Sequence, residues 1–374
     1  MHSLFDGFSP VSKADWLDKV ARDLKGRSIE ELNHQWTEQI QLSPFFHLED
    51  SLELPPLVNA TGGNWEIGSC IQVEDPAESN AILLDELQHG VNAPRLVLKD
   101  PLSAKAWEVL LNGVEPAYIS LQIYPTFQET EPASWLDPLL ATLSKKGVTS
   151  ANRVGAIRIG EEAIEKVLVN WNLYQERFPR MRKLYIDNSM NFRTFNPEQE
   201  LALAAYMAFY RLEEAISKGV DAQEAHDNLH VVLAVGTSFF RDLAKLRAFR
   251  ILWANLLQAA ALAVHQAPFI SVQFAPESQD EDMHTNMIRA TTQAMSAVIG
   301  GADHLEILPA NATVESTTGF TRRVARNLHH ILSMEAHLDQ VMDPAAGSYF
   351  METLSVQIAE KAYAIFREMK SPFR

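Results

Sequence analysis

The residues best suited to chemistry in this chain stand at the ends of short apolar segments. A general acid–base catalyst would need paired carboxylates or a histidine among them. Asp75-Pro76 and Asp100-Pro101 precede helical sequence, where capping of backbone N–H groups explains the acids, and Asp187 is the strongest acidic candidate for catalysis. The full set of segment-end residues is Glu74, Asp75, Lys99, Asp100, Tyr124, Arg158, Asp187, Asn188, Ser189, Thr237, Gln273 and Asn311.

The twelve histidines invite a search for metal ligands. His226 and His230 have i,i+4 spacing, but their segment runs from a loop into a strand, which breaks the helical pair that chelation needs. His329 and His330 are sequence neighbours and therefore point to different faces of a helix. The patterns predict packed or solvated histidines and no metal site.

Three further segments could carry chemistry. Residues 282–284 read Asp-Met-His, the start of a cobalamin-ligating DxHxxG box, yet Met287 replaces the glycine and the segment leads into helical sequence. Cys70 could be a nucleophile, but on an apolar strand a cysteine is more often a small buried hydrophobe. The basic residues of 245–250 could bind phosphate, although a solvated or ion-paired helix face is the favoured interpretation.

The elements that must position these residues alternate between β-rich and helical patterns. Continuous apolar runs such as 231–235 are typical of parallel strands buried on both faces, and eight units fit a (β/α)8 TIM barrel. The rival is an open doubly wound sheet, which usually carries a Gly-rich nucleotide turn, and neither GxGxxG nor GxxxxGK[ST] occurs. We therefore predict a barrel over 65–374. Its predicted strands are 67–73, 95–98, 118–123, 154–159, 183–186, 230–235, 269–274 and 304–308.

The first 64 residues differ from this pattern and predict an extended N-terminal arm. Ser12 is followed three residues later by Asp15, an N-capping pattern, and apolar residues then recur at helical spacing until Gly26, so we expect a helix at about 12–25. The rest of 1–64 is irregular but rich in apolar residues. Such an arm must pack against its own barrel or against a second chain.

Composition limits the class of protein. The formal charge of −16, with no basic stripe to offset it, argues against binding of nucleic acid. The single cysteine excludes an internal disulfide framework. The first residues lack the basic region and apolar run of a secretion signal, and no apolar run reaches the roughly 18 residues of a membrane span. We expect a cytoplasmic protein.

Four stretches give the chain a specific resemblance. They are FSPVSKADWLDKVARDLKG, NWEIGSCIQVEDPAESNA, SFFRDLAKLRAFRILWANLL and DPAAGSYFMETLSVQIAEKAY. Together they resemble the opening helix, first barrel strand, sixth-strand helix and closing segment of the small subunit of heterodimeric bacterial, coenzyme-B12-dependent methylmalonyl-CoA mutases. In the closing turn, Pro344 restricts the chain, Gly347 permits an unusual backbone conformation, and Tyr349 and Phe350 can pack as the helix within 343–370 begins.

The resemblance implies a fold, a partner and a cofactor. The catalytic subunits of this family thread an acyl-CoA along the barrel axis, and a flavodoxin-like domain beyond the barrel binds cobalamin. We expect the barrel portion of a small subunit, without that domain and binding no cofactor or metal itself. Its partner would be a large subunit that holds adenosylcobalamin and interconverts (R)-methylmalonyl-CoA and succinyl-CoA. A homodimer is possible in isolation.

Departures from the family pattern fall on the chemistry. The resemblance places Cys70 where catalytic subunits have a tyrosine over the substrate, and Ser189, before Met190, where they have a histidine that binds the migrating carbonyl. A thiol cannot replace a phenol ring, and serine cannot reach as far as imidazole or carry its charge. We therefore expect a non-catalytic subunit, with partner contacts at Trp16, Leu17, Phe45 and Phe46.

Two alternatives stay open. The chain could be an active acyl-CoA mutase-like protein, or another TIM-barrel enzyme, that uses Asp187 and neighbouring strand-end residues. It could also be a homo-oligomeric scaffold with no mutase partner. A barrel axis lined by small polar side chains would favour retained CoA binding, whereas an axis plugged by bulky side chains would favour a purely structural role.

Overall fold

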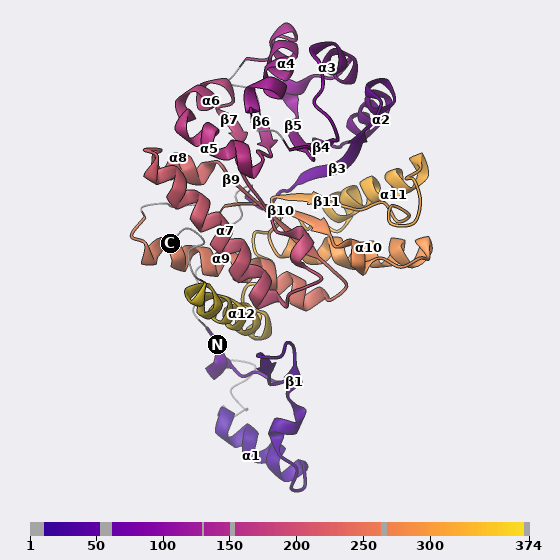
Figure 1. The fold of residues 1–374 in the computed structure, drawn as a ribbon. Coiled ribbons are helices and arrows are strands. Elements are labelled where there is room, and N and C mark those ends of the chain that lie inside the picture. Colours follow the sequence, from indigo (N-terminus) through magenta and orange to yellow (C-terminus); the bar gives the residue numbers. More distant parts are fainter. Residues whose placement is uncertain (1–10, 53–61, 129–130, 150–153, 263–267, 370–374) are drawn as a thin grey trace, which may run out of the picture.

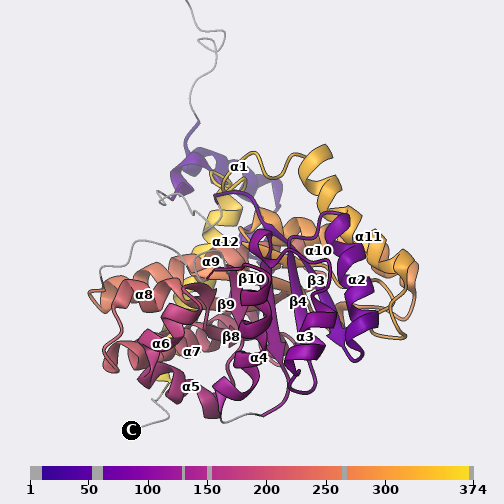
Figure 2. The same ribbon diagram turned by 90° about the horizontal axis from the view of Figure 1, so that it is seen from above.

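The computed structural model describes residues 11–52, 62–128, 131–149, 154–262 and 268–369. Parallel strands form the centre of the molecule, and helices surround them (Figures 1 and 2). The strands are β3 (Glu66–Val73), β4 (Ala93–Leu98), β5 (Ser120–Pro125), β6 (Val154–Ile157), β7 (Arg180–Arg182), β8 (Leu184–Asp187), β9 (Leu229–Val235), β10 (Phe269–Phe274) and β11 (His304–Glu306).

The nine parallel strands follow the order β7-β6-β5-β4-β3-β11-β10-β9-β8. The two outermost strands, β7 and β8, are separated along the chain by Lys183 alone, so the sheet is nearly closed as a barrel. Every residue of β9 is buried, as a parallel strand covered on both faces requires. The predicted α/β TIM-barrel-like fold is confirmed.

The prediction of a single fifth strand at 183–186 is wrong in one respect. The structure has two short strands here, β7 before Lys183 and β8 after it. The buried Lys183 ammonium donates to the carbonyl oxygens of Phe178 and Met181 at 2.8 and 2.9 Å. It also donates to Gln175 Oε1 and Asn228 Oδ1, both at 2.8 Å. A buried ammonium needs such acceptors. Three of them lie on the chain just before Lys183, and the fourth, Asn228, directly precedes β9.

Other strand boundaries shift by no more than two residues. The predicted strand 118–123 is observed at Ser120–Pro125, because a short 3-10 turn, Pro116–Tyr118, precedes it. The predicted strand 154–159 ends earlier, at Ile157.

The helices cover the outside of the strands, and α12 lies across α7 and α9 (Figure 1). Their bounds are α2 (Pro76–Gln88), α3 (Ala104–Leu110), α4 (Pro132–Lys145), α5 (Glu161–Val169), α6 (Trp171–Arg177), α7 (Pro197–Ser217), α8 (Ala222–Asp227), α9 (Phe239–Ala259), α10 (Met283–Ile299), α11 (Gly319–His330) and α12 (Tyr349–Glu368). None of the helices in the described ranges is long and apolar enough to cross a membrane.

Helix caps match the sequence patterns at most positions. Asp75 caps α2, as predicted, and its Oδ1 accepts from the backbone N–H groups of Ala77 and Glu78. The expectation for Asp100 is wrong, because α3 begins later and is capped by Ser103. Asp100 and Pro101 instead belong to the loop that leads from β4 to this helix.

The arm lies beside α12, apart from the strands (Figures 1 and 2). Its helix α1 (Lys13–Asp23) is capped by Ser12 and Asp15 in a capping box, and the strands β1 (His34–Gln35) and β2 (Gln41–Leu42) form a small antiparallel hairpin. Ile40 and Leu42 are buried, and Thr37 Oγ1 donates to Glu198 Oε1 of α7 at 2.6 Å. The hairpin therefore anchors the arm to the barrel.

Candidate functional site

The carboxyl ends of the parallel strands form the mouth of the barrel, where TIM-barrel enzymes carry their active sites. Tyr124 at the end of β5 donates its hydroxyl hydrogen to Asp187 Oδ2 on β8, at 2.7 Å. Ser189 donates from its Oγ and its backbone N–H to Asp187 Oδ1, at 2.6 and 3.1 Å. The structure thus brings these three predicted residues together. Both carboxylate oxygens of Asp187 are engaged.

Two arginines flank the Tyr124 ring. The guanidinium carbon of Arg158 lies 4.9 Å from the ring centroid and that of Arg95 lies 5.1 Å from it. Arg158 also donates to the carbonyl of Pro125 at 2.8 Å. Burial, and secondarily the charge of Asp187, raises the pKa of Tyr124 to about 12. The phenol is therefore protonated at neutral pH and acts as the donor to Asp187.

A buried ion pair crosses the barrel interior next to Tyr124. Arg95 on β4 donates from Nε and Nη2 to the two carboxylate oxygens of Glu306 on β11, at 2.7 and 2.6 Å. The two side chains are 11% and 6% exposed. Burial acts to lower the pKa of Arg95, but the charge of Glu306, its hydrogen bonds to Arg95 and the charges of Cys70 and Tyr185 together outweigh burial and raise that pKa well above its ordinary value. Strand β3 lies between β4 and β11, so the pair spans the face of β3 that carries Cys70.

Aromatic and imidazole rings continue the filling of the interior. The Tyr185 ring of β8 lies 5.8 Å from that of Tyr124 and stacks on His230 at 4.6 Å. His230 Nε2 is 2.8 Å from Ser271 Oγ, which is 2.7 Å from His304 Nδ1. Burial raises the pKa of Tyr185, and the charge of Arg95 on the other side of the ring of strands acts on it through space. Side chains from five strands therefore meet around the axis.

Cys70 lies among these groups and is not reactive. Burial raises the pKa of its thiol to about 11, so the thiolate that a nucleophile requires is scarce at neutral pH. Two residues earlier, a Cβ atom on Gly68 would overlap the ring of His304. Strand β3 therefore presents small residues to the interior, and the larger side chains of its neighbours occupy the space.

Arg95, Glu306 and Tyr185 were missed by the sequence analysis. Each is a polar residue within a predicted strand, and a polar side chain in such a segment was the signal that could have found them. Of the other predicted strand-end residues, Arg158 stacks on Tyr124 and so joins the group. Three others have partners elsewhere: Glu74 pairs with Lys99 at the exposed rim, Asn188 donates to the carbonyl of Glu200, and Asn311 donates to Glu315 and Ser316 within its own loop.

The histidines are packed rather than arranged to bind metal. His226 Nε2 accepts from the Trp253 indole at 3.0 Å, and His329 Nδ1 accepts from the Trp65 indole at 3.1 Å. Burial lowers the pKa of His226 to about 4 and that of His329 to about 3. Within the described ranges, no cluster of three or more His, Cys, Asp or Glu side chains could hold a metal ion.

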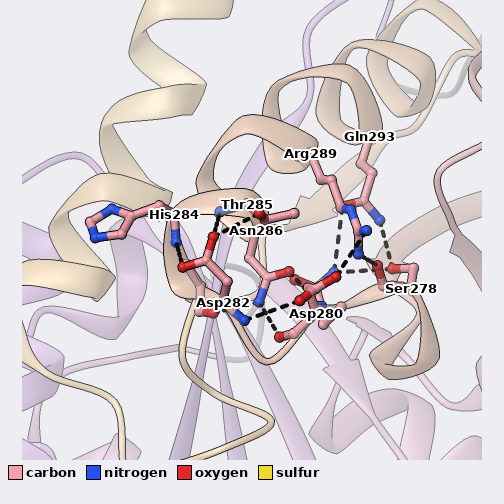
Figure 3. Close-up of polar contacts among 10 residues, drawn as sticks. Ser278, Asp280, Asp282, His284, Thr285, Asn286, Arg289 and Gln293 are labelled. Carbon is pink, nitrogen blue, oxygen red and sulfur yellow. Dashed lines mark hydrogen bonds and ion pairs between the residues drawn. The ribbon is translucent and has the colours of Figure 1, made fainter.

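The segment 282–284 is a helix cap (Figure 3). Asp282 Oδ1 accepts from the backbone N–H of His284 at 3.2 Å, and Oδ2 accepts from that of Thr285 at 2.9 Å. The side-chain amide of Asn286 fixes the preceding turn, because its Oδ1 accepts from the backbone N–H of Asp280 and its Nδ2 donates to the carbonyl of Asp280. Because His284 belongs to the first turn of α10, the segment lacks the flexible loop on which a cobalamin-ligating histidine would sit. These residues do not fit that cofactor.

The basic helix face predicted at 245–250 is ion-paired, and it is buried rather than solvated. Lys245 bonds Glu200 Oε2 at 2.8 Å, and Arg250 contacts Asp303 Oδ2 at 3.2 Å. Their charges are therefore not available to a phosphate group at the surface.

The third cation of this face, Arg247, explains the closing turn of the barrel. It forms a buried ion pair with Asp343, a residue held in the left-handed conformation at φ +50°. Gly347 completes the turn at φ +79°, and its N–H donates to Glu352 of α12 at 2.8 Å. Phe350 then contacts Trp36 of the arm, with ring centroids 5.2 Å apart. The turn joins α9, α12 and the arm.

Comparison with known proteins places this geometry in context. Residues 161–372 match the family model described as methylmalonyl-CoA mutase. The chain is 29% identical to a methylmalonyl-CoA mutase small subunit of Porphyromonas gingivalis over 97% of this chain and 63% of that protein. It is 29% identical to a small subunit of Streptomyces virginiae over 83% of this chain and 52% of the relative. The chain thus spans between about half and two thirds of these relatives.

A methylmalonyl-CoA mutase of Rhizobium meliloti is 33% identical over 46% of this chain and 25% of its own length. Among solved structures, a Burkholderia cenocepacia dihydropteroate synthase aligns with a TM-score of 0.40 and 10% identity, covering 74% of this chain and 94% of the synthase.

Proposed function

The chain belongs to the methylmalonyl-CoA mutase family, and on this premise we propose that it acts as a non-catalytic small subunit. In this proposal a large subunit holds adenosylcobalamin and interconverts (R)-methylmalonyl-CoA and succinyl-CoA in the cytoplasm. The similar proteins named small subunits support the pairing with a large one.

The filled barrel axis is the observation that carries the proposal. An acyl-CoA threaded along the axis would have to displace the bidentate Arg95–Glu306 pair and the stacked rings of Tyr185 and His230. Separating a buried ion pair leaves an uncompensated charge and costs about 3–5 kcal/mol. The bulky axial side chains therefore favour support of a partner over binding of CoA.

The chemistry of the mouth supports the same conclusion. The Cys70 thiol, with its pKa raised to about 11, offers neither a phenol ring nor a thiolate. Ser189 commits its hydroxyl hydrogen to Asp187 and carries no charge with which to polarise a thioester carbonyl. Asp187 in turn accepts from Tyr124 and Ser189, so its geometry gives no support to a role as a free general base.

The arm supports the proposed contact with a partner. Across its described residues, 11–52, only Ile40 and Leu42 are buried, which is too little apolar burial for an independent fold. Trp16 packs edge-on against Phe45, with centroids 5.5 Å apart, yet Phe45 is 47% exposed. Phe46 contacts Phe350 of the barrel instead. Trp16, Leu17 and Phe45 are thus the stronger candidates for the interface, and Phe46 also anchors the arm.

A pull-down tests the proposal. The tagged chain is recovered from extract of its source cells, bound proteins are identified by mass spectrometry, and adenosylcobalamin-dependent succinyl-CoA formation is assayed on the eluate and on the chain alone. We expect a larger mutase chain in the eluate and activity only in the complex. Turnover by the isolated chain would refute the non-catalytic role, and a stable homodimer without a mutase partner would favour a scaffold.

A matched pair of variants locates the contact. Phe45→Ser should reduce recovery of the large chain, because it removes an exposed apolar group from the arm. Tyr118→Ser is the control, since Tyr118 is 85% exposed and lies at the start of β5, at the other end of the barrel. Equal recovery with both variants would show that the arm does not form the interface.

A further inference from the structure

A polar cavity of about 460 Å³ opens at the amino-terminal ends of the strands, at the opposite end of the barrel from the mouth. Its walls come from the start of β6, from β7 and the chain that precedes it, and from α8 with the residues on either side of that helix. Its volume is within the range of small-molecule sites. The cavity plays no part in the function proposed above.

The amide groups that line the cavity already have partners. Gln175 and Asn228 both accept from the Lys183 ammonium through their side-chain oxygens. Their amide nitrogens donate to the carbonyls of Pro179, at 3.3 Å, and Glu224, at 2.9 Å. The Lys183 contacts therefore hold this wall rigid, and its amides have little capacity left for a ligand.

Arg182 differs from these neighbours. Its guanidinium stacks on the Phe269 ring at 3.6 Å, and it makes no hydrogen bond or ion pair with any residue that the structure describes. The charges of Glu66, Asp303 and Asp227 act on it through space only. A guanidinium presents five N–H donors in a planar fork that matches a carboxylate or phosphate. The side chain is thus a cation without a bonded anion.

The acidic wall of the cavity contains a complementary group. Asp221 caps α8 through Oδ1, which accepts from the N–H groups of Gln223 and Glu224. Asp227 accepts from Gln223 Nε2 through one oxygen, at 2.7 Å. The half-buried Glu224 carboxylate has no hydrogen bond or ion pair within the described part of the chain. Glu224 and the second oxygen of Asp227 can therefore accept from an ammonium group.

We propose that this cavity binds a small zwitterion, with its carboxylate on Arg182 and its ammonium group on Glu224 and Asp227. A short amino acid has this chemistry. Arg180 and Asp221 also line the cavity, so charged groups of both signs, rather than the occupied amides, would recognise the ligand. A simple anion would leave the acidic wall unsatisfied, and a simple amine would leave Arg182 unpaired.

Calorimetric titration of the full chain with β-alanine tests the site. Propionate and propylamine each keep one of the two charges and serve as comparison ligands. We expect β-alanine to bind with one-to-one stoichiometry and each comparison ligand to bind at least about tenfold more weakly. Propionate binding as tightly as β-alanine would overturn the proposal, as would the absence of binding by glycine, β-alanine and γ-aminobutyrate alike.

Variants assign the contacts. Arg182→Met keeps the packing on Phe269 but removes the charge, and we expect it to weaken β-alanine binding about ten- to hundredfold. Glu224→Gln, at a half-buried position, provides a second test should Arg182→Met fail to fold. Arg158→Met is the matched control, because Arg158 also stacks on a ring but lies at the mouth. Equal weakening by the control, or unchanged affinity in Glu224→Gln, would refute the assignment.

Discussion

The Arg95–Glu306 pair provides the sharpest test of the filled axis. Glu306→Leu leaves the Arg95 guanidinium buried with no anion, while Arg95→Met/Glu306→Leu replaces the pair by apolar groups. At an effective dielectric constant of about 20, charges about 4 Å apart attract by about 4 kcal/mol. Loss of one partner of a buried pair costs about 3–5 kcal/mol, whereas replacement of both is often neutral or stabilising.

We therefore expect Glu306→Leu to lower the free energy of unfolding by about 3–5 kcal/mol and the double variant to recover most of that loss. Urea-induced unfolding followed by circular dichroism measures both. Glu74→Leu is the matched control, because Glu74 pairs with Lys99 at the exposed rim and its loss should leave the unfolding midpoint unchanged. A loss below about 1 kcal/mol in Glu306→Leu would refute the reasoning, as would a double variant no more stable than the single one.

The same double variant tests whether the Arg95–Glu306 pair only supports the fold or also takes part in substrate binding. If the axis serves only to support the fold, the double variant should restore the complex with the large subunit and its full mutase activity. A double variant that is stable and complexed, yet lowers activity severalfold, would show that the axis of this chain takes part in the reaction.

The remaining predictions concern pH and the closing turn. Burial lowers the pKa of His226 from 6.5 to about 4 and that of His329 from 6.5 to about 3, so on acidification the unfolded chain binds protons that the folded chain does not. Each histidine should therefore lower the free energy of unfolding by about 2 kcal/mol at pH 5, as measured by urea titration. Burial lowers the pKa of Lys183 from 10.5 to about 7, so between these two values the unfolded chain holds a proton that the folded chain lacks. Stability should therefore rise from pH 7 to 10, a dependence that Lys183→Met abolishes in the same titrations. Asp343→Ala should lower the thermal midpoint and cost up to about 3–5 kcal/mol, because it removes the ion-pair partner of the buried Arg247 and leaves it only the through-space charge of Glu352. Asp343→Asn, which tolerates positive φ, should cost less.

Local patterns in the sequence were enough to predict much of the fold. Apolar runs located the strands, and caps such as Ser12 and Asp75 located helix starts, because each depends on residues within one turn of each other. The break at Lys183 was not predictable in this way. A lysine inside a strand pattern does not reveal that carbonyl groups from α6 and β7 will surround its ammonium group.

The site was predicted only in part, for a similar reason. Strand ends can be read from sequence, which is why Tyr124, Asp187 and Ser189 were found. Arg95 and Glu306 are 211 residues apart in the chain, and no periodicity connects them. Their pairing becomes visible only when β3 places β4 and β11 on its two sides.

The position of Cys70 links the sequence departures to the packing. A small residue at this point of β3 leaves space inside the barrel, and the Arg95–Glu306 pair spans the face of the strand on which it lies. The family resemblance places a tyrosine there in catalytic subunits, and a phenol ring would compete with that pair for the same volume. We infer that loss of the tyrosine and filling of the axis are two parts of one change. Cys70→Tyr should therefore destabilise this chain by overpacking, by about 1–3 kcal/mol in urea titrations. The same substitution should cost far less stability in the Arg95→Met/Glu306→Leu background. Equal losses of stability in both backgrounds would show that the two features are independent.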